Sequence, residues 1–533
     1  MPTLITAADV VHLHPQDNIC VAARDLPGGT VVSTAAGSVT IAEPVTMGHK
    51  IALAAIGEGE RVLKFGQPIG LTTRAVKPGE WVHSQNLHNG EFERDYAFAT
   101  EVPAPLSPIT GRTFMGYRRA SGKAATRNYI AIISTVNCSA SVSKAIARGV
   151  SSELLAKYPN VDGIVPLTHT SGCATSSSSK HIEFLHRVMS GYAKHPNIVG
   201  CLIVGLGCEV ATPGELVSRG KLVQLGMPRV ITGQATGAGS AKPQAATRPG
   251  PIIMSMQDMG GTRKTIERGI ELISDMLPLA NDVSREPIPA SELILGTECG
   301  GSDGYSGITA NPALGFASDM IVACGGTSIL SETTEIYGAE HLLTRRAVSE
   351  KVGRKLLDLI EWWKWYAGVW GLVIDNNPSQ GNKAGGLTTI YEKSLGAVAK
   401  GGTTALRAVY EYAQEVTEKG FVVMDSPGFD PPSVTGMVAG GANMVCFTTG
   451  RGSCFGCKPV PSIKIATNTP MFQRMEEDMD INAGAILQGV PVEEVGKQIF
   501  ETILAVASGK RTKSEELGLG DEEFLPWHLG PVL

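Results

Sequence analysis

The segment NYIAIISTVNCSASVSKAIARGVSSELLAKY, residues 128–158, decides the fold class of this chain. It begins with an apolar run that predicts a strand and continues with a stretch that predicts a helix. The same order of strand and helix recurs over residues 161–192 and 197–226. Strands that alternate with helices favour a parallel sheet with helices on its faces. The sequence therefore predicts an α/β protein.

The remaining residues extend this pattern on both sides. Short β-type runs broken by turns predict a small all-β domain over residues 1–95, and the closely spaced prolines of EVPAPLSPITG place a linker over 96–116. A first α/β section is expected over 117–250, ending in a Gly-, Ala- and Pro-rich stretch at 233–250 that is typical of a flexible interruption. A second α/β section is expected over 251–533, with its first strand in SELILGTEC. A multidomain chain agrees with its length.

The charge pattern and the N-terminal residues exclude some classes of function. The net charge is only −5 for 533 residues, and no run of Lys or Arg forms the basic stripe typical of nucleic-acid binding, so we expect no nucleic-acid partner. No basic segment followed by a long apolar one opens the sequence, and no stretch has the length of a membrane span. We therefore expect a cytoplasmic protein without a membrane partner. A symmetric homo-oligomer is the default expectation for its assembly.

Four apolar strands of the predicted sheets end at a cysteine. These are Cys138, Cys173, Cys208 and Cys299, and the first three follow one another at intervals of 35 residues. Ligands collect beyond the carboxyl ends of parallel strands, so we expect the four thiols to converge on one metal site. Such thiolates suit iron, an iron–sulfur cluster or zinc. The alternative is that each cysteine is a small core residue, since free cysteine is among the residues most often buried.

The same stretches resemble a known family, the altronate and galactarate dehydratases, which also includes sulfolactate sulfo-lyase. The matching motifs occur in order along nearly the whole chain: HPQDN at 14–18, GHKIAL at 48–53, HTSGC at 169–173, VGLGCE at 204–209, ECGGSDGYSGITANP at 298–312, GNKAGG at 381–386 and FTTGRG at 447–452. The resemblance implies an N-terminal SAF domain, as the small β domain of this family is called, followed by a larger α/β region. It also implies an iron-dependent enzyme that converts an aldonate or aldarate to a 2-keto-3-deoxy acid.

Two departures from the family pattern bear on the substrate. After FTTGRG the altronate and galactarate members usually carry a Thr-Pro pair, whereas this chain has Ser453 and Cys454. The loop EWVHSQN, with His83, resembles altronate dehydratases, because galactarate members commonly have an acidic residue there. Altronate is therefore the first expected substrate and galactarate the second.

Dehydration of a sugar acid requires a base for a weakly acidic proton and help for a poor leaving group. His169 is a candidate base because it lies in the strand-end loop HTSGC, and a structural histidine is the alternative. Glu332 is a second candidate, whereas Glu335 is expected to cap a helix. Lys383 and Lys393 lie in glycine-containing motifs, where a desolvated lysine can bind a carboxylate or act as a base. We select His169, Glu332 and Lys383 as the catalytic set.

Substrate anchoring requires donors for a carboxylate and for several hydroxyls. Arg451 lies between glycines in TTGRG, where its guanidinium could reach a carboxylate, and a surface ion pair is the alternative. Ser302, Asp303 and Asn311 lie in a glycine-rich loop that suits a polyol, although turn formation alone would explain much of its composition.

Three histidines of the β domain complete the predicted substrate site. His14, His49 and His83 stand at turns or strand ends. They could contact the substrate, close over it as a lid or bind a second metal, and an ordinary surface position is the alternative for each.

Three functions are consistent with these residues. The first is a hydro-lyase that acts on a sugar acid. The second is a sulfolactate sulfo-lyase type of carbon–sulfur lyase, in which the same proton abstraction expels sulfite. The third is a carbohydrate-binding protein that has lost its chemistry. His169, Glu332 and the four strand-end cysteines favour a catalytic function over the third.

Overall fold

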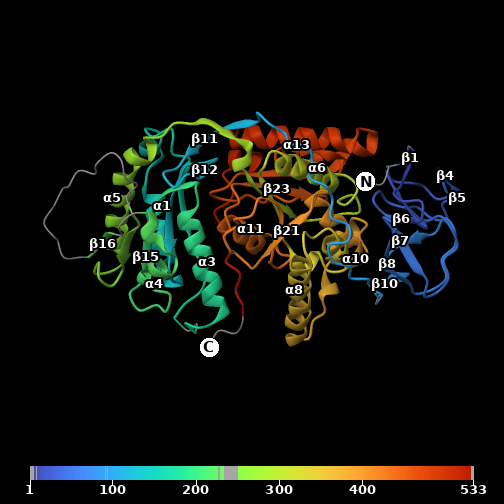
Figure 1. Cartoon of the computed structure of the whole chain (residues 1–533), viewed down its shortest axis with the longest axis horizontal. Helices are drawn as coiled ribbons and strands as arrows, with labels where there is room; N and C mark the ends of the chain where they lie inside the picture. Colours follow the sequence, from blue (N-terminus) through green and yellow to red (C-terminus); the bar gives the residue numbers. More distant parts are fainter. Residues whose placement is uncertain are drawn as a thin grey trace.

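Three units lie in a row along the long axis of the molecule (Figure 1). The computed structural model describes residues 5–7, 9–90, 92, 94–173, 176–225, 229–232 and 250–529. The N-terminal β domain, in blue, forms one end of the row, and the first α/β unit, in teal and green, forms the other. The second α/β unit, in yellow to red, lies between them although it comes last in the sequence. The predicted fold class, a small β domain followed by a larger α/β region with parallel sheets, is confirmed.

Short antiparallel strands build the N-terminal β domain. They form a five-stranded sheet of order β1-β2-β3-β6-β9, a three-stranded sheet of order β10-β8-β7 and the hairpin β4-β5. Their bounds are Ile5–Ala7 (β1), Val10–His12 (β2), Ile19–Ala22 (β3), Val31–Thr34 (β4), Gly37–Thr40 (β5), Lys50–Ala52 (β6), Arg61–Lys64 (β7), Gln67–Thr72 (β8), Trp81–Val82 (β9) and Leu87–His88 (β10). Valine and isoleucine dominate their buried positions, as β-branched side chains fit a pleated, half-buried surface.

The first α/β unit is a five-stranded parallel sheet of order β14-β13-β15-β17-β16. Its strands are Tyr129–Ser134 (β13), Gly163–Leu167 (β14), Ile198–Gly205 (β15), Arg229–Ile231 (β16) and Ile252–Ser255 (β17), and its helices are Asn137–Gly149 (α1), Ser152–Leu155 (α2), Lys180–Lys194 (α3), Pro213–Arg219 (α4) and Thr262–Asn281 (α5). The predicted boundary at 250 is wrong. Strand β17 pairs with β15, and α5 packs on this sheet, so the unit continues to residue 281.

Residues 233–249, the expected flexible interruption, lie outside the described residues.

The second α/β unit is a seven-stranded parallel sheet of order β21-β22-β20-β19-β23-β24-β25. Its strands are Ile294–Cys299 (β19), Thr327–Leu330 (β20), Leu406–Tyr410 (β21), Gly420–Met424 (β22), Met444–Thr449 (β23), Ser462–Ala466 (β24) and Ile481–Asn482 (β25). Its helices are Ala310–Ala323 (α6), Glu340–Arg345 (α7), Glu350–Val369 (α8), Gln380–Ala384 (α9), Ile390–Ala397 (α10), Asp430–Ala439 (α11), Thr469–Arg474 (α12), Val492–Ala507 (α13) and Lys513–Glu516 (α14). A small antiparallel sheet of Thr113–Arg118 (β11), Ala124–Ala125 (β12) and Glu286–Pro289 (β18) links the two α/β units.

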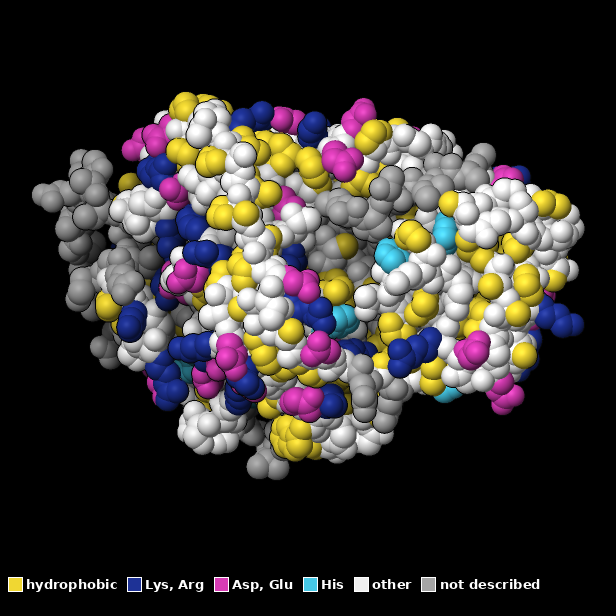
Figure 2. All heavy atoms as spheres, turned by 45° about the vertical axis from the view of Figure 1, so that its right-hand side comes forward, with side chains coloured by type: hydrophobic (Ala, Val, Ile, Leu, Met, Phe, Trp, Pro, Cys, Tyr) yellow, Lys and Arg dark blue, Asp and Glu magenta, His cyan; other side chains and the backbone are white. Residues whose placement is uncertain are grey.

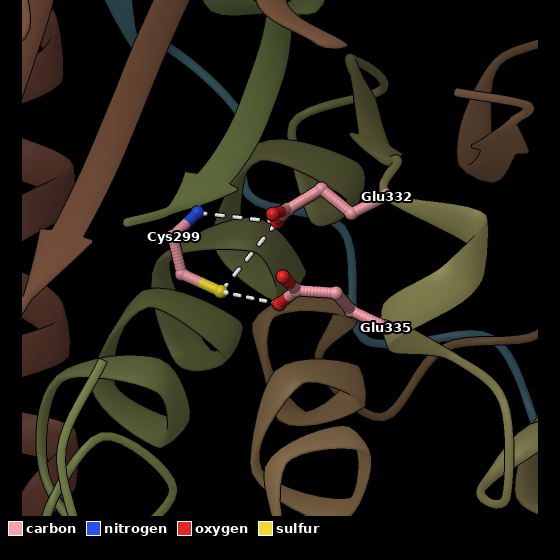
Figure 3. Close-up of side chains that lie close together, drawn as sticks. All are labelled: Cys299, Glu332 and Glu335. Atoms are coloured by element: carbon pink, nitrogen blue, oxygen red, sulfur yellow. Dashed lines mark hydrogen bonds between the residues drawn. The ribbon is translucent and has the colours of Figure 1, made fainter. Parts of the chain in front are cut away.

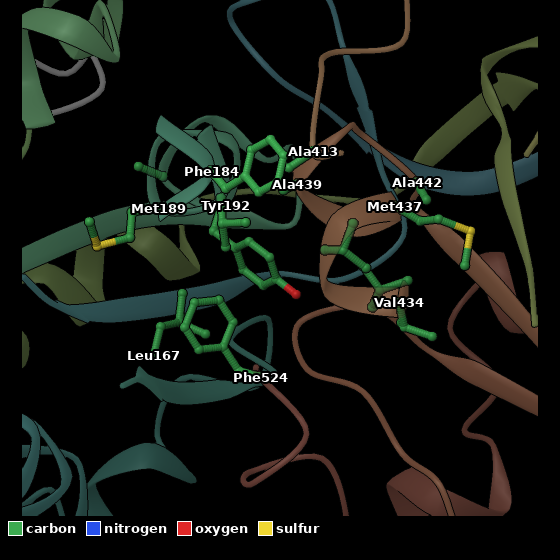
Figure 4. Packing of buried hydrophobic residues seen from close by; sticks show 14 of the residues in the cluster. Leu167, Phe184, Met189, Tyr192, Ala413, Val434, Met437, Ala439, Ala442 and Phe524 are labelled. Atoms are coloured by element: carbon green, nitrogen blue, oxygen red, sulfur yellow. The ribbon is translucent and has the colours of Figure 1, made fainter. Parts of the chain in front are cut away.

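The two α/β units share one apolar core. Helix α3 of the first unit packs on α11 of the second, and Phe184 and Tyr192 lie beside Val434 and Met437 (Figure 4). The helices approach closely because α3 has a glycine at the crossing: a Cβ on Gly191 would lie 2.3 Å from the carbonyl oxygen of Ala439. This contact fixes the two parallel sheets relative to each other.

The β domain docks on the opposite side of the second α/β unit. The main chains of the two units are in direct contact there, because a Cβ added at Gly386 would lie 2.2 Å from the carbonyl oxygen of Gly48. The hydroxyl of Tyr305 donates a hydrogen bond to the carbonyl of Ala22 over 2.5 Å. The sequence motifs GHKIAL and GNKAGG, which are more than 300 residues apart, therefore touch.

The outer surface carries charges of both signs. Acidic and basic side chains are interspersed over the face shown in Figure 2. Within the described part of the chain, no helix combines the length and the apolar character that crossing a bilayer requires.

Candidate active site

A buried cluster of reactive side chains lies at the carboxyl edge of the seven-stranded sheet. Cys299 is the last residue of β19, Glu332 follows the neighbouring strand β20, and Glu335 ends the short turn Thr333–Glu335. The sulfur of Cys299 lies 3.5 Å from Oε2 of Glu332 and 3.5 Å from Oε2 of Glu335 (Figure 3). Parallel neighbouring strands bring these residues together because their carboxyl ends meet at one edge.

The backbone at Glu332 is strained. Its φ of 63° lies in the left-handed region, which residues other than glycine rarely adopt. The strained peptide is held in place by the hydroxyl of Ser426, which accepts a hydrogen bond from the Glu332 amide at 2.8 Å. The amide of Cys299 also donates to the Glu332 carboxylate, at 3.2 Å. Such strain persists where the surroundings fix it, often at functional sites.

Two buried lysines neutralise the two carboxylates. Lys400 Nζ lies 2.5 Å from Oε2 of Glu332, and both side chains are at most 1% exposed. Lys393 Nζ lies 2.6 Å from Oε1 of Glu335 and also donates to Asn377. The predicted capping role of Glu335 is wrong, because its carboxylate faces Cys299 and Lys393 rather than a helix terminus.

A second pair of carboxylates adjoins Glu332. Ligand atoms of Glu298, Glu332 and Asp430 all lie within 4.8 Å of one another, as do those of Cys299, Glu332 and Glu335. Glu298 accepts a hydrogen bond from the hydroxyl of Ser433 at 2.6 Å through one oxygen. The other oxygen of Glu298 and Oε1 of Glu332 are buried without a hydrogen-bond partner among the described residues.

The charges of this cluster do not balance. Four carboxyl groups face two ammonium groups. Burial and the charge of Glu332 therefore raise the pKa of Glu298 well above its ordinary value. Burial and the charges of Glu332 and Glu335 raise the pKa of Asp430 to about 7. Burial is the strongest influence on Glu332 and would raise its pKa, but the charges of Lys400 and Lys393 and the hydrogen bond with Glu298 together keep that pKa below its ordinary value.

This donor set fits a divalent cation. The excess negative charge, the unpartnered oxygen of Glu332 and the thiol of Cys299 are the features that such an ion would satisfy. The raised pKa values of Glu298 and Asp430 reflect the same excess of negative charge. Cys299, Glu332 and Glu335 are the residues that could hold it.

A cleft opens from the cluster to the surface. Cys299, Glu335, Lys393, Asp430 and Asn382 line this cleft. Aromatic side chains of α8 line it as well. A small substrate bound in this cleft would lie beside the carboxylates and the lysine.

The β domain contributes basic groups to its interface with the second α/β unit. Lys50 and Lys64 are buried against Glu392 of α10, at 2.9 and 2.8 Å. His49 accepts a hydrogen bond from the indole of Trp81 and bonds the carbonyl of Ala384, at 3.1 and 3.3 Å. The ion triad and the imidazole therefore attach the β domain to α10 and to the end of α9.

Some of the predicted substrate-binding residues lie together between the β domain and the second α/β unit, and others only support the surrounding loops. His83 stacks on Trp81, its Nδ1 is buried without a hydrogen-bond partner among the described residues, and burial lowers its pKa to about 3. Arg451 is exposed, and the charge of Arg451 lowers the pKa of His49, after burial and Lys50. Lys383 is half-buried, and its charge contributes to lowering the pKa of His83. These four cationic or imidazole groups face one region between the β domain and the second α/β unit.

The other predicted polar residues are mostly engaged in structure. Asp303 accepts hydrogen bonds from Thr467 and Asn468, and Asn311 bridges Thr448 and the carbonyl of Gly396. Their hydrogen-bonding capacity is used by the protein, so their predicted role in substrate binding is corrected to loop support.

Ser302 and His14 differ from those two residues. The hydroxyl of Ser302 is buried without a hydrogen-bond partner in the described part of the chain and remains a candidate. His14 contacts its own turn through the amide of Gln16 and the β-domain residue Gly66, so the structure gives it no place in the site.

His169 is a structural histidine. Its Nε2 bonds the carbonyl of Ser134 at 3.0 Å, and its Nδ1 accepts from the amide of Ser171 at 3.2 Å. Burial lowers its pKa to about 4. Since both ring nitrogens are occupied by the backbone, the prediction that His169 is the base is wrong. It lies in the loop after β14 of the five-stranded sheet, whereas the carboxylate cluster lies at the edge of the seven-stranded sheet.

The four strand-end cysteines belong to two different sheets. Cys299 ends a strand of the seven-stranded sheet and is buried, whereas Cys138, Cys173 and Cys208 follow strands of the five-stranded sheet and are exposed. They do not all lie at equivalent ends of neighbouring strands, which was the reason to expect one shared site. That expectation is wrong for Cys299, whose thiol contacts Glu332 and Glu335 instead.

Three residues of the cluster were missed by sequence reasoning. Glu298 directly precedes Cys299, Lys400 stands alone in the apolar stretch SLGAVAKGG, and Asp430 opens α11 in GFDPPS. A single charge within an apolar stretch was the available signal for Lys400, because such a charge is either exposed or paired in the interior. Asp430 gave no such signal, since an acidic residue in a first helical turn is ordinary.

Comparisons with known proteins assign the class. A model of the D-galactarate/altronate dehydratase C-terminal domain matches residues 290–532, a model of the second domain of D-galactarate dehydratase/altronate hydrolase matches 116–281, and a model of the altronate/galactarate dehydratase SAF domain matches 8–90. The fold, the site and these matches define a hydro-lyase of the dehydratase class.

Curated relatives place the chain more closely. It is 37% identical to the galactarate dehydratase (L-threo-forming) of Escherichia coli (strain K12), over 96% of this chain and 95% of that protein. It is 33% identical to the altronate dehydratase of Bacillus subtilis (strain 168), over 95% of this chain and 96% of that protein. The (2R)-sulfolactate sulfo-lyase subunit beta of Chromohalobacter salexigens is 29% identical over 77% of this chain and 96% of that subunit. The chain belongs to the galactarate/altronate dehydratase family.

Proposed function

We propose that this protein is a cytoplasmic hydro-lyase that converts a sugar acid, an aldonate such as altronate or an aldarate such as galactarate, to a 2-keto-3-deoxy acid. The observation that carries the proposal is the buried group of Cys299, Glu332 and Glu335, which opens to a cleft that Lys393 and Asp430 also line. The names of the relatives supply the substrate class.

Asp430 has the properties of the proton-transfer group. Its carboxyl lines the cleft, and its pKa of about 7 lets it take up or release a proton near neutral pH. In the proposed reaction, ionised Asp430 removes the proton from the carbon beside the substrate carboxylate. The protonated Asp430 then donates that proton to the departing hydroxyl, which leaves as water. Lys393 balances the negative charge that develops on the substrate.

Cys299, Glu332 and Glu335 would hold a divalent cation, with iron(II) as the first choice. When bound, such an ion acts as a Lewis acid toward the substrate oxygens. Lys400 keeps Glu332 ionised and in place, so that its free oxygen faces the cluster.

Arg451 and Lys383 are proposed to bind the anionic end of the substrate. No carboxylate of the described residues forms an ion pair with either side chain, although both lie near the imidazoles of His49 and His83. A guanidinium in this position can bind a carboxylate through two parallel hydrogen bonds.

A substrate panel tests the proposed function. The full-length protein would be assayed anaerobically with Fe²⁺ on altronate, galactarate, other sugar acids and sulfolactate, with 2-keto acid and sulfite as products. We expect 2-keto acid from a six-carbon sugar acid. Sulfite release without turnover of any sugar acid would move the assignment to the sulfo-lyase branch, and binding without either product would indicate a non-catalytic protein.

Arg451→Lys should raise KM by about 10-fold with little change in kcat, because lysine keeps the charge but loses one of two parallel hydrogen bonds. Steady-state kinetics on the best substrate of the panel would measure this. The exposed Arg263→Lys on α5 is the matched control and should leave KM unchanged. An unaltered KM in Arg451→Lys would mean that Arg451 does not touch the substrate.

Asp430→Asn should lower kcat by about 10²-fold or more with a smaller effect on KM, because an amide cannot exchange the proton. Exchange of the substrate C2 proton with deuterated water, followed by NMR, should fall in parallel. Asp521→Asn, which removes a surface partner of Lys458, is the control and should leave both rates unchanged. C2 exchange at the wild-type rate in Asp430→Asn would assign the proton abstraction to another group.

A further inference from the structure

We propose that Cys138, Cys173 and Cys208 together hold an iron–sulfur cluster at the carboxyl edge of the five-stranded sheet. This site is separate from the carboxylate cluster around Cys299. The proposal does not depend on which reaction the carboxylate cluster catalyses.

The sheet topology brings the three cysteine loops side by side. Strand β13 lies between β14 and β15, and Ile133 pairs with Leu167 on one side and Ile203 on the other. Each strand then ends within a few residues of its cysteine. Because the strands are parallel and in neighbouring positions, the three loops leave the sheet at the same edge.

Hydrogen bonds fasten the three loops to one another. The amide of Asn137, next to Cys138, donates to the carbonyl of Ser171 at 2.9 Å, which ties the first loop to the second. The hydroxyl of Thr135 donates to the carboxylate of Glu209 at 2.8 Å, which ties the first loop to the third. The amide of Gly207 also donates to Glu209, at 2.7 Å. The three loops thus form one connected framework with a cysteine in each.

The positions of the three thiols exclude a role as core residues. All three side chains are exposed and none forms a disulfide, whereas Cys201, in the middle of β15, is buried. Free cysteine is among the residues most often buried, so three exposed thiols on one sheet edge require another explanation. Cys138 also lies in the first turn of α1, a helix of 13 residues, where the positive end of the helix dipole stabilises an anionic sulfur.

The three thiols are not arranged for a single tetrahedral ion. Thiolates bound to one tetrahedral ion at about 2.3 Å lie only about 3.8 Å from one another. The described groups whose ligand atoms all lie within 4.8 Å of one another do not include these three thiols. A cluster spans a larger distance because its own sulfides complete the coordination of each iron. Three protein thiolates are one fewer than the four that commonly hold a four-iron cluster, so one iron would be left for a non-protein ligand.

Metal and sulfide analysis of the full-length protein tests the proposal. Protein purified without oxygen, or reconstituted with iron and sulfide, should contain about four irons and four acid-labile sulfides per chain beyond any iron of the carboxylate site. It should also show the visible absorption and the reduced-state EPR signal of a cluster. Each of the single variants Cys138→Ser, Cys173→Ser and Cys208→Ser should abolish the sulfide and these spectra while circular dichroism and thermal unfolding of the metal-free protein stay unchanged.

Two matched controls separate this site from others. Cys454→Ser removes an exposed cysteine elsewhere and should keep the full sulfide content. Cys299→Ser alters the carboxylate cluster and should also keep it, even where it abolishes turnover. This last variant distinguishes failure of the proposed reaction from failure of the proposed cluster.

Alkylation mapping keeps the test independent of how well the variants fold. In the wild-type protein, the cluster should protect the three exposed thiols from alkylation, and removal of iron by a chelator should restore labelling at all three, as read by mass spectrometry. Sulfide-free protein after anaerobic reconstitution, a stoichiometric zinc ion in place of iron and sulfide, or wild-type sulfide content in any one of the three variants would overturn the proposal.

Discussion

Glu332→Gln is expected to abolish turnover and to destabilise the fold. The amide can neither balance the buried ammonium of Lys400, 2.5 Å away in the wild-type protein, nor offer a charged ligand atom to a cation. We expect a loss of kcat/KM of about 10³-fold or more, since a bound metal contributes several kcal/mol to a transition state. Loss of this ion pair should also lower the folding free energy, by less than the roughly 3–5 kcal/mol of an isolated buried pair, because Glu298 can ionise beside Lys400. Kinetics, metal analysis and urea denaturation would measure the three effects.

The double variant Glu332→Gln/Lys400→Met separates stability from chemistry. Replacing Lys400 by an apolar side chain of similar length removes the buried ammonium that has lost its 2.5 Å partner, so part of the lost stability should return. Activity and metal binding should not return, because the carboxylate is still absent. Activity restored together with stability would show that Glu332 acts only through the fold.

Glu392→Gln is expected to detach the β domain from the second α/β unit. Glu392 is fully buried and receives Lys50 at 2.9 Å and Lys64 at 2.8 Å, both from the β domain. Burial would raise the pKa of Glu392, but the two lysines outweigh it and hold the pKa far below its ordinary value. With glutamine, two buried ammonium groups would face no anion, at a cost of about 3–5 kcal/mol.

Denaturation and limited proteolysis would measure this effect. The connector before β11 should become more sensitive to protease, and the unfolding midpoint in urea should fall. Glu80→Gln is a control within the same domain, because its partner Arg74 is exposed and such surface pairs contribute at most about 1 kcal/mol. An unchanged midpoint in Glu392→Gln would mean that the apolar contacts between the domains suffice to hold them together.

The same interface determines what truncation would do. Although a proline-containing linker follows the β domain, the core of this domain is continuous with that of the second α/β unit through Tyr305 and Leu395. Deleting the β domain would expose those side chains and leave Glu392 without its partners. A truncated protein should therefore be less stable as well as less active.

The sequence by itself determined the local structure and the family. Alternation of apolar strands and helices predicted the α/β class, and the order of motifs from HPQDN to FTTGRG predicted the galactarate/altronate dehydratase family; both are confirmed. It also marked Glu332 and the four cysteines as chemically important positions. The fold class could be predicted because periodicity and turn residues act within a few positions along the chain, whereas the roles of Glu332 and the cysteines remain predictions.

Only the tertiary structure decided which of these residues meet. Cys138 and Cys299 look alike in the sequence, each at the end of an apolar strand, but they belong to different sheets, and strand order is set by packing across the whole chain. Lys400 reaches Glu332 across 68 residues, and Asp430 and Glu298 join them from two further elements. Such contacts produce no periodic pattern in the sequence, because a buried ion pair depends on the distance between side chains in space. The chemistry of the site was therefore fixed by strand order and burial, which no short stretch of the chain specifies.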